Sequence, residues 1–353
     1  MRNPYRHEGL YIAGPECFYS EGYTLWWAQR KLAEYRGIPV VLPTSTALKL
    51  DHEDKRKNAK EIFDDLIVQV SRTTAIIADL DTFRGNEPDG GTIFELGWMY
   101  AKGNRLYGYS RDCRPIAVKQ VGTSWEQGIL RDSRGAAIPY PGLPFCPSVM
   151  ASTKLVEGDF KSALDLFRID LDETRKGIRK EVTDILFIRH EAMPRLYVAS
   201  QDRNQDDARQ KYQAMRQVAE TKGYELVTPN DEVYGLPKPE TDDELMLASW
   251  DFRRRMALLK SSDIIIADLS NHAGGWEPDN DISFECGAAY GWGKQCYAYT
   301  SDARNMRDRI PNADGLDWSG FIVEDFDLPI NLMFGVSFRI VQGDFFSAFA
   351  SLK

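Results

Sequence analysis

The chain has 353 residues, of which 43% are hydrophobic and 27% are charged, a composition typical of a soluble protein with two domains of ordinary size. Its formal net charge of −9 argues against a nucleic-acid partner, because no basic face is available to neutralise phosphates. No apolar run approaches the roughly 20 residues that cross a bilayer, and the first residues lack the apolar centre of a secretory signal, so we expect a cytoplasmic protein without a membrane partner.

Strands and helices alternate along the first half of the chain. Helices are predicted in "TLWWAQRKLAEYRG", which Gly37 ends, in "AKEIFDDLIVQVS", and in "FELGWMYAKG", which ends at Gly103. Runs of apolar and β-branched residues between them are typical of strands buried on both faces. These predicted strands are 10–13, 40–42, 75–80 and 105–109.

A charged segment, "RIDLDETRKGIRKEVTDILFIR", follows at residues 168–189. Its density of charge is typical of an exposed, partly helical linker. We therefore expect a first domain at 1–167, a linker at 168–193 and a second domain at 194–353.

The second half repeats the first in the same order. "LYIAG" returns as "LYVAS", "TTAIIADL" as "SDIIIADL", "EPDGGTIFELG" as "EPDNDISFECG" and "VEGDFKSAL" as "VQGDFFSAF", always 185 to 190 residues later. Ordered matches at a nearly constant offset indicate a tandem duplication. The strands predicted in this copy are 196–199, 225–228, 264–269 and 296–299.

Alternating strands and helices predict an α/β fold with doubly wound, mainly parallel sheets and right-handed crossovers. Ligands of such sheets bind beyond the carboxyl ends of the strands. The stretch "NEPDGGTIFELG", at residues 86–97, follows the strand at 75–80 and should therefore lie on that edge.

Cysteine and histidine usage limits the possible chemistry. The five cysteines are scattered and form no CxxC pair, so we expect reduced thiols and neither a disulfide framework nor a zinc site. None of the four histidines has ligand spacing, which argues against a metal centre and a Ser-His-Asp triad. If the protein is an enzyme, carboxylates should carry the reaction.

Two carboxylates, Asp89 and Glu95, flank the glycines Gly90 and Gly91. We expect Glu95 in the first turn of a helix, where the dipole and free amides would keep it charged and nucleophilic. The glycines allow a tight turn, and Asp89 could donate or accept a proton. Such a pair suits substitution at the anomeric carbon of a sugar. A simple helix cap would use the same residue types, so the residues alone leave both interpretations open.

Four segments together resemble the nucleoside 2-deoxyribosyltransferases: "YIAGPECF", "IADLDTFRGNEPDGGTIFELG", "TSDARNMRDR" and "LPINLM". Both halves show the resemblance, which covers most of the chain outside the linker. It implies two flavodoxin-like domains that form an intramolecular pseudo-dimer. It also implies exchange of the base on a 2′-deoxynucleoside through a covalent deoxyribosyl-glutamate, with free nucleobases and 2′-deoxynucleosides as partners and no cofactor.

The resemblance assigns roles by position. Glu95 matches the family nucleophile, Asp89 the acid that handles the proton on the base, and Tyr11 the tyrosine that orients the nucleophile. Phe18 resembles an aromatic that packs on the base, although plain core packing would also place an aromatic there. A further family acid or amide falls on Leu66, with Asp65 beside it as a weaker candidate.

Family sites are completed by an Asn-x-Met from a neighbouring subunit, whose Asn contacts the 5′-hydroxyl region of the sugar. The second half supplies this motif as Asn331 and Met333 in "PINLM". In the first half "PSVM" puts Ser148 in place of the Asn. Fusion of the two halves would therefore deliver Asn331 to the site of Glu95.

The second copy departs from the family pattern around its own acids. Asn280 and Asp281 replace the glycine pair, and Arg254 and Arg255 stand where an acid or amide is expected. We predict one working site per chain, at Glu95, although two working sites with different specificity are the alternative. The second-site counterparts that remain are Glu285, Asp279 and Tyr197.

Three functions stay open. The first is the transferase, and the second is an N-glycosidase in which water accepts the sugar of a nucleoside or nucleoside 5′-monophosphate. Glu16, early in the loop after the first strand, would repel a phosphate unless it points away, which favours unphosphorylated nucleosides. The third is a non-catalytic nucleotide-binding sensor or scaffold. The pseudo-dimer could stand alone or form a homo-oligomer such as a trimer.

Overall fold

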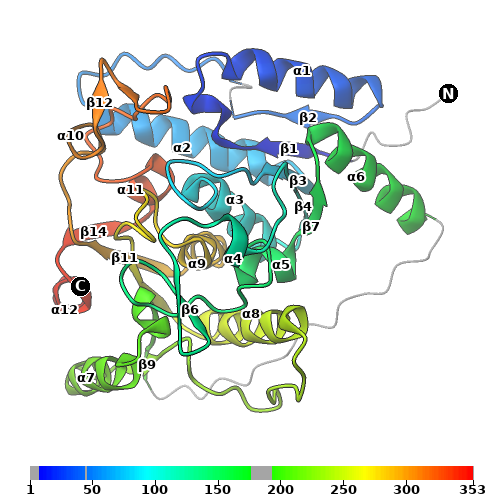
Figure 1. Cartoon of the computed structure of the whole chain (residues 1–353). Helices are drawn as coiled ribbons and strands as arrows, with labels where there is room; N and C mark the ends of the chain where they lie inside the picture. Colours follow the sequence, from blue (N-terminus) through cyan, green and yellow to red (C-terminus); the bar gives the residue numbers. More distant parts are fainter. Residues whose placement is uncertain (1–7, 44–45, 176–192, 353) are drawn as a thin grey trace.

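A computed structural model describes residues 8–43, 46–175 and 193–352 and contains two parallel five-stranded sheets (Figure 1). The first sheet has the order β2-β1-β3-β4-β7 and the second the order β9-β8-β10-β11-β14. The strands are β1 (Leu10–Ala13), β2 (Val40–Val41), β3 (Ala75–Asp79), β4 (Arg105–Ser110), β7 (Lys154–Glu157), β8 (Arg195–Ala199), β9 (Glu225–Val227), β10 (Ile264–Asp268), β11 (Gln295–Thr300) and β14 (Arg339–Gln342).

Each sheet has helices on both faces, as the predicted α/β class requires. The main helices of the first unit are α1 (Gly22–Tyr35), α2 (Lys55–Ser71), α3 (Gly90–Ala101), α5 (Pro147–Ser152) and α6 (Phe160–Arg175). Those of the second unit are α7 (Ala208–Thr221), α8 (Glu244–Lys260), α9 (Asn280–Gly291), α11 (Leu332–Ser337) and α12 (Phe345–Ala350). Short elements fill the loops: η1 (Pro15–Phe18), η2 (Gln201–Asn204), α4 (Ile116–Lys119), α10 (Met306–Arg309), and the hairpins β5 (Ser124–Glu126)–β6 (Ile129–Arg131) and β12 (Asn312–Ala313)–β13 (Leu316–Asp317).

All eight predicted strands are present, but the fifth strand of each sheet was not predicted. These strands, β7 and β14, pair with β4 and β11 and lie within the repeated "VEGDF" and "VQGDF" segments. Both are half-exposed sheet edges with polar ends. They therefore lack the continuous apolar run that identifies a strand buried on both faces.

The segment expected as a linker begins inside α6. This helix continues to Arg175, and its residues Phe167 and Leu171 are buried against the first sheet. Residues 176–192 lie outside the described residues. Within the described ranges no helix is long and apolar enough to cross a membrane.

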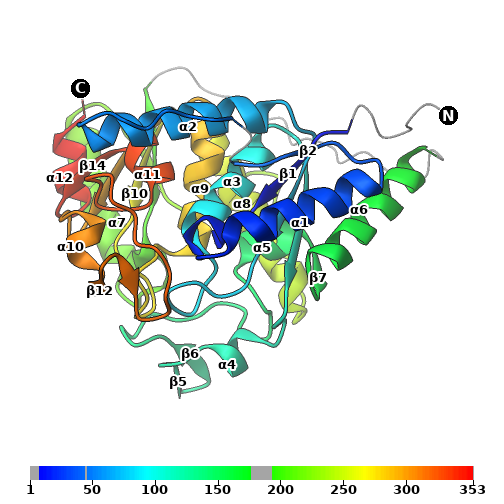
Figure 2. The same cartoon turned by 90° about the horizontal axis from the view of Figure 1, so that it is seen from above.

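The two units meet along α3 and α9, which lie side by side at the centre of the molecule (Figures 1 and 2). A Cβ atom on Gly97 would lie 2.0 Å from the carbonyl oxygen of Phe284, and one on Gly287 would lie 1.9 Å from that of Phe94. Only glycine permits this approach of two helix backbones. A single apolar core runs through this contact and joins both units, so the expected pseudo-dimer is confirmed.

Strand alternation sends the first-strand tyrosine toward that centre. Leu10 and Ile12 face the outer core under α1 and α6, whereas Tyr11 and Ala13 face the central core that holds α3. The carboxyl ends of β1 and β3 lead into η1 and α3. The residues that the sequence singled out are thereby gathered at one edge of the first sheet.

Candidate active site

A pocket opens at this edge and draws its lining from both units. The first unit contributes Gly14, Cys17, Phe18, Trp26, Pro43, Leu66, Asp89, Gly91, Thr92 and Glu95, and the second contributes Glu324, Asn331, Leu332 and Met333. The structure thus brings together most of the first-site residues proposed from the sequence.

Glu95 is held by a hydrogen bond from the Tyr11 hydroxyl to its Oε1 over 2.6 Å. The expected place of Glu95 in the first helical turn is wrong: α3 begins at Gly90, so Glu95 lies in the second turn, where the helix has no free amides to offer. Burial raises the pKa of Glu95 to about 8, with the Tyr11 bond opposing and Asp89 adding to the shift. Burial therefore favours the neutral acid.

Asp89 is the N-cap of α3. Its Oδ2 accepts hydrogen bonds from the backbone N–H and the hydroxyl of Thr92, each over 2.7 Å. Its Oδ1 is buried and has no hydrogen-bond partner among the described residues. Burial raises the pKa of Asp89, while the Thr92 bonds oppose the shift. Asp89 is both a cap and a carboxyl with one oxygen free, so the cap interpretation does not exclude a role in chemistry.

Gly91 makes room for Asn331 of the second unit. A Cβ atom on Gly91 would lie 2.8 Å from the Nδ2 of Asn331, whose Oδ1 accepts a hydrogen bond from the backbone N–H of Met333. Gly90 faces the second unit as well, since a Cβ atom there would lie 3.1 Å from Oε2 of Glu277. The glycine pair therefore serves the close contact between units.

Phe18 lines the pocket and also belongs to an aromatic cluster. Its ring stacks on Phe83 at a centroid distance of 5.2 Å, and Phe83 stacks in turn on Phe321. Leu66 lines the pocket from α2, whereas Asp65 does not, although one oxygen of Asp65 is buried without a hydrogen-bond partner among the described residues.

Glu16 does not line the pocket. Its Oε1 accepts a hydrogen bond from Gln29, and its Oε2 lies so close to Gly14 that a Cβ atom there would be 2.1 Å away. A phosphate bound in the pocket would therefore not contact the Glu16 carboxyl directly, and its repulsion by Glu16 stays a prediction.

Sequence reasoning missed Glu324, a carboxylate that lines the pocket from the loop before α11. It lies in "VEDFDLP", between the short hairpin and the "LPINLM" motif. No periodicity or spacing distinguishes it from the neighbouring acids Asp325 and Asp327 in the sequence.

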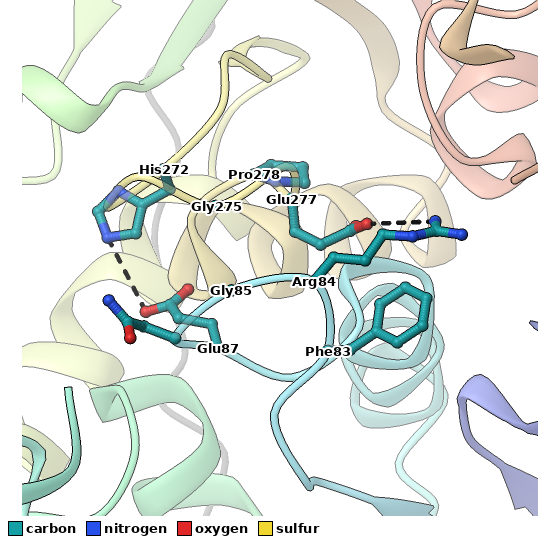
Figure 3. Close-up of a pocket in the computed structure, with 9 residues that line it drawn as sticks. Phe83, Arg84, Gly85, Glu87, His272, Gly275, Glu277 and Pro278 are labelled. Atoms are coloured by element: carbon teal, nitrogen blue, oxygen red, sulfur yellow. Dashed lines mark ion pairs between the residues drawn. The ribbon is translucent and has the colours of Figure 1, made fainter. Parts of the chain in front are cut away.

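The loops that precede α3 and α9 face each other, and a glutamate of each loop contacts the backbone of the other unit (Figure 3). Glu87 of the first unit accepts a hydrogen bond from the backbone N–H of Asn280 over 3.0 Å. Its counterpart Glu277 accepts from the backbone of Gly90. Each unit therefore caps the N-terminus of the other unit's central helix.

Arginine and histidine complete this contact. Nη1 of Arg84 lies 3.9 Å from Oε1 of Glu277, and Nε of Arg84 donates to Oδ2 of Asp317 over 2.8 Å. Nε2 of His272 lies 3.9 Å from Oε1 of Glu87 (Figure 3). The loop carrying Asp89 is thereby fixed by residues of the second unit.

Residues 10–144 and 196–333 each match the family model described as nucleoside 2-deoxyribosyltransferase, and together they make up most of the chain. The chain belongs to the nucleoside 2-deoxyribosyltransferase family. It carries the family domain twice.

Solved structures include a 2-desoxiribosyltransferase from Leishmania mexicana that is 31% identical to this chain. The match covers 96% of that protein and 45% of this chain, with a TM-score of 0.37. A subunit of an ABC sugar transporter from Rhodobacter sphaeroides 2.4.1 matches at 11% identity and a TM-score of 0.18. That match covers 83% of this chain and 77% of the transporter subunit. A comparison with curated proteins gave no match.

The second family domain has ion pairs where the first has an open pocket. Arg255, at the position of Leu66, is buried and donates to Oε1 of Glu285 over 2.5 Å and to Oδ1 of Asp281 over 2.8 Å. Arg203 donates to Asp279 over 2.8 Å and to Asp281 over 3.2 Å. Both predicted second-site acids, Glu285 and Asp279, are thus bound to arginine.

Tyr197 does not repeat the bond of Tyr11. Its hydroxyl is buried and has no hydrogen-bond partner among the described residues, because Glu285 is bonded to Arg255 instead. Although burial opposes the shift, Arg255 and Arg203 hold the pKa of Asp281 below its usual range. The second family site is therefore a set of charged pairs.

The predicted correspondence between Ser148 and Asn331 is wrong by two residues. Asn331 is the N-cap of α11, and the N-cap of the equivalent helix α5 is Cys146. Ser148 lies in the first turn of α5, where its backbone N–H and hydroxyl donate to Asp281. The match of "PSVM" with "PINLM" needs a gap, whereas the ungapped match of "LPFC" with "LPIN" places Cys146 at the position of Asn331.

No metal site is apparent in the part of the chain that the structure describes, because it holds no group of three or more His, Cys, Asp or Glu side chains able to bind an ion. The five cysteines are free, and they range from exposed to buried.

Proposed function

We propose that the protein transfers a 2-deoxyribosyl group between nucleobases at the Glu95 pocket, through a covalent ester on Glu95. The supporting observation is one pocket in which Glu95, held by Tyr11, shares the space with Asp89 and with Asn331 from the other unit. Membership of the nucleoside 2-deoxyribosyltransferase family supports the same substrates. Nucleoside salvage, in which a base is exchanged on an intact deoxyribose, is the natural use of this reaction.

The proposed reaction has two half-reactions, the departure of the first base and the attack of the second. The ionised Glu95 carboxylate attacks C1′ of a 2′-deoxynucleoside, the bond from C1′ to the base nitrogen breaks, and its electron pair leaves with the base. Asp89, whose Oδ1 has no other partner among the described residues, donates a proton to the departing base. A second base then attacks C1′ and loses its proton to Asp89, and Glu95 is released as carboxylate.

The same proposal includes a single working site per chain. At Glu285 the carboxylate is paired with Arg255, and Asp281 stands at the place of Gly91. An arginine that neutralises the carboxylate weakens it as a nucleophile, and a side chain at that glycine position takes the space into which a sugar would fit. The second unit then acts mainly by delivering Asn331.

A base-exchange assay tests the proposal. The protein is incubated with deoxyinosine in the presence and absence of adenine, and products are separated by chromatography. Deoxyadenosine that forms only with adenine, together with hypoxanthine, supports the transferase. Free deoxyribose, formed both with and without adenine, would show that the protein is a hydrolase and refute the transferase. Nucleoside binding by calorimetry without any turnover would favour a sensor and refute catalysis.

A further inference from the structure

One pocket residue, Glu324, has a role that neither the family match nor the steps above assign. Its Oε2 accepts a hydrogen bond from the backbone N–H of Leu332 over 3.1 Å, which fixes the side chain at the pocket wall beside Asn331 and Met333. Burial raises the pKa of Glu324 to about 8, with Asp89 adding to the shift and Arg84 opposing it. The second unit therefore places an acid, and not only an amide, against the substrate space.

The charge around this space is one-sided. Three carboxyl groups line it, those of Asp89, Glu95 and Glu324, and none of the described residues in its lining is Lys, Arg or His. The buried Arg84 does not line the pocket, and it donates to Asp317 and to the carbonyl oxygen of Ile322. A substrate phosphate would meet several acids in this lining and no cation.

The position of Glu324 is filled differently in the other pocket. The backbone bridge of Leu316 with Ile322 repeats, in the second copy, the bridge of Arg131 with Ala137. Two residues beyond each bridge lie Glu324 and Pro139, and Pro139 lines the pocket of the second unit. The carboxylate is therefore delivered to the pocket with the Tyr11–Glu95 bond, and its counterpart in the other pocket is an apolar ring.

We infer that Glu324 is a specificity-determining residue that accepts a hydrogen bond from a hydroxyl of the deoxyribose and repels a 5′-phosphate. A carboxylate accepts hydroxyl hydrogen bonds and offers no donor when ionised, and a like charge in a confined site acts against the wrong ligand. The site then takes 2′-deoxynucleosides and refuses their 5′-monophosphates. This inference rests on the proposed function for the position of the sugar, but its test does not require turnover.

The test measures the binding of deoxyinosine and of deoxyinosine 5′-monophosphate by calorimetry at about pH 9, where Glu324 is ionised, in a Glu95→Ala background so that neither ligand is consumed. The readout is the ratio of the Kd of the monophosphate to that of the nucleoside. Glu324→Gln should weaken the nucleoside about threefold through loss of a charge-assisted bond. It should tighten the monophosphate about tenfold by removing one like charge. The ratio then falls about thirtyfold.

Asp325→Asn is the matched control, because Asp325 follows Glu324 in the chain, pairs with Lys55 and does not line the pocket. Its ratio should equal that of the parent. Glu324→Asp, which keeps the charge, should retain most of the discrimination and provides a second measurement if the glutamine variant does not fold. A ratio for Glu324→Gln within twofold of the parent would overturn the inference, as would a parent that binds both ligands equally or neither.

Failure of the inference and failure of the proposed function give different results. A wild-type protein that exchanges bases while Glu324→Gln leaves the ratio unchanged retains the transferase and loses the inference. If the wild-type protein exchanges no base, but its discrimination against the monophosphate disappears in Glu324→Gln, the inference is retained and the proposed transferase is refuted.

Discussion

The hydroxyl of Tyr11 donates a 2.6 Å hydrogen bond to the carboxyl of Glu95, and this contact links strand β1 of the first sheet to the central helix α3. The contact acts on a side chain whose pKa burial has raised to about 8. Tyr11 therefore favours the ionised form against the effect of burial. The proposed nucleophile is a carboxyl that is easily protonated at neutral pH and becomes reactive when it loses its proton.

The pH profile of the proposed reaction should report this shift. Because Glu95 must be ionised to attack, kcat/KM should rise with pH and level off above about 8, well above the ordinary glutamate value. Tyr11→Phe removes a bond to the ionised form, so it should move the rise to higher pH and lower the rate. Initial rates of base exchange between pH 5 and 9.5 provide the measurement. A rise centred near pH 4.5 would contradict the assignment.

Thermal stability should fall as pH increases over the same range. Burial raises the pKa of Glu95, Glu324 and Glu87 to about 8 and that of Glu277 to about 7. Between about pH 4.5 and 8 the folded chain holds protons that the unfolded chain has lost, so unfolding becomes more favourable with rising pH.

Glu95→Gln isolates one contribution to this slope. The amide cannot ionise, and its oxygen can still accept from Tyr11. The variant should melt at the same temperature as the parent near pH 5 and about 4 °C higher near pH 8.5. Calorimetric melts at the two pH values make the comparison. A constant difference at both would mean that Glu95 ionises as readily in the folded chain as in the unfolded one.

The two central glutamates should differ in importance for turnover. Glu95→Ala removes the proposed nucleophile and should lower kcat about a thousandfold or more. Glu285→Ala should leave most of the activity, because Glu285 is bonded to Arg255 in the other unit's site. Rates of base exchange for the two variants, with a melt to establish folding, decide between one and two working sites. Equal losses would refute the one-site proposal.

The contact between units at Gly91 makes Asn331 the next residue to test. Asn331→Ala removes the amide that faces Gly91 in the pocket, so KM for the deoxynucleoside should rise about tenfold or more. The matched control is Cys146→Ala, the same cap position in the other unit. Steady-state kinetics of both variants should separate them. A similar KM in both would mean that Asn331 does not touch the substrate.

Much of this arrangement was visible in the sequence. The apolar runs located eight strands, and the repeat located two similar units, because buried parallel strands and duplicated segments leave local patterns. The edge strands β7 and β14 were missed because half-exposed strands have no such pattern. Fold and pseudo-dimer therefore followed from local features and a resemblance.

The contacts inside the site did not follow in the same way. The raised pKa of Glu95 depends on burial by segments distant in the sequence, and the orientation of Glu16 depends on Gln29 and Gly14. Glu324 reaches the pocket only because the two units pack along α3 and α9. Such facts require the three-dimensional neighbours of each carboxyl group, which spacing along the chain does not provide.

The ion pairs of the second site should be coupled as a unit. Arg255 is buried and bonded to both Glu285 and Asp281, so Arg255→Leu, which copies the residue type at position 66, leaves Glu285 without its bonded cation and Asp281 with Arg203 alone. This substitution should lower the free energy of unfolding by about 3 kcal/mol or more. Asp281→Gly, which copies Gly91, removes one of those carboxylates. In the double variant the loss should be smaller than the sum of the single losses by about 1–3 kcal/mol. Urea unfolding of the parent, the two single variants and the double variant closes the cycle, and additive losses would show that Arg255 and Asp281 act independently.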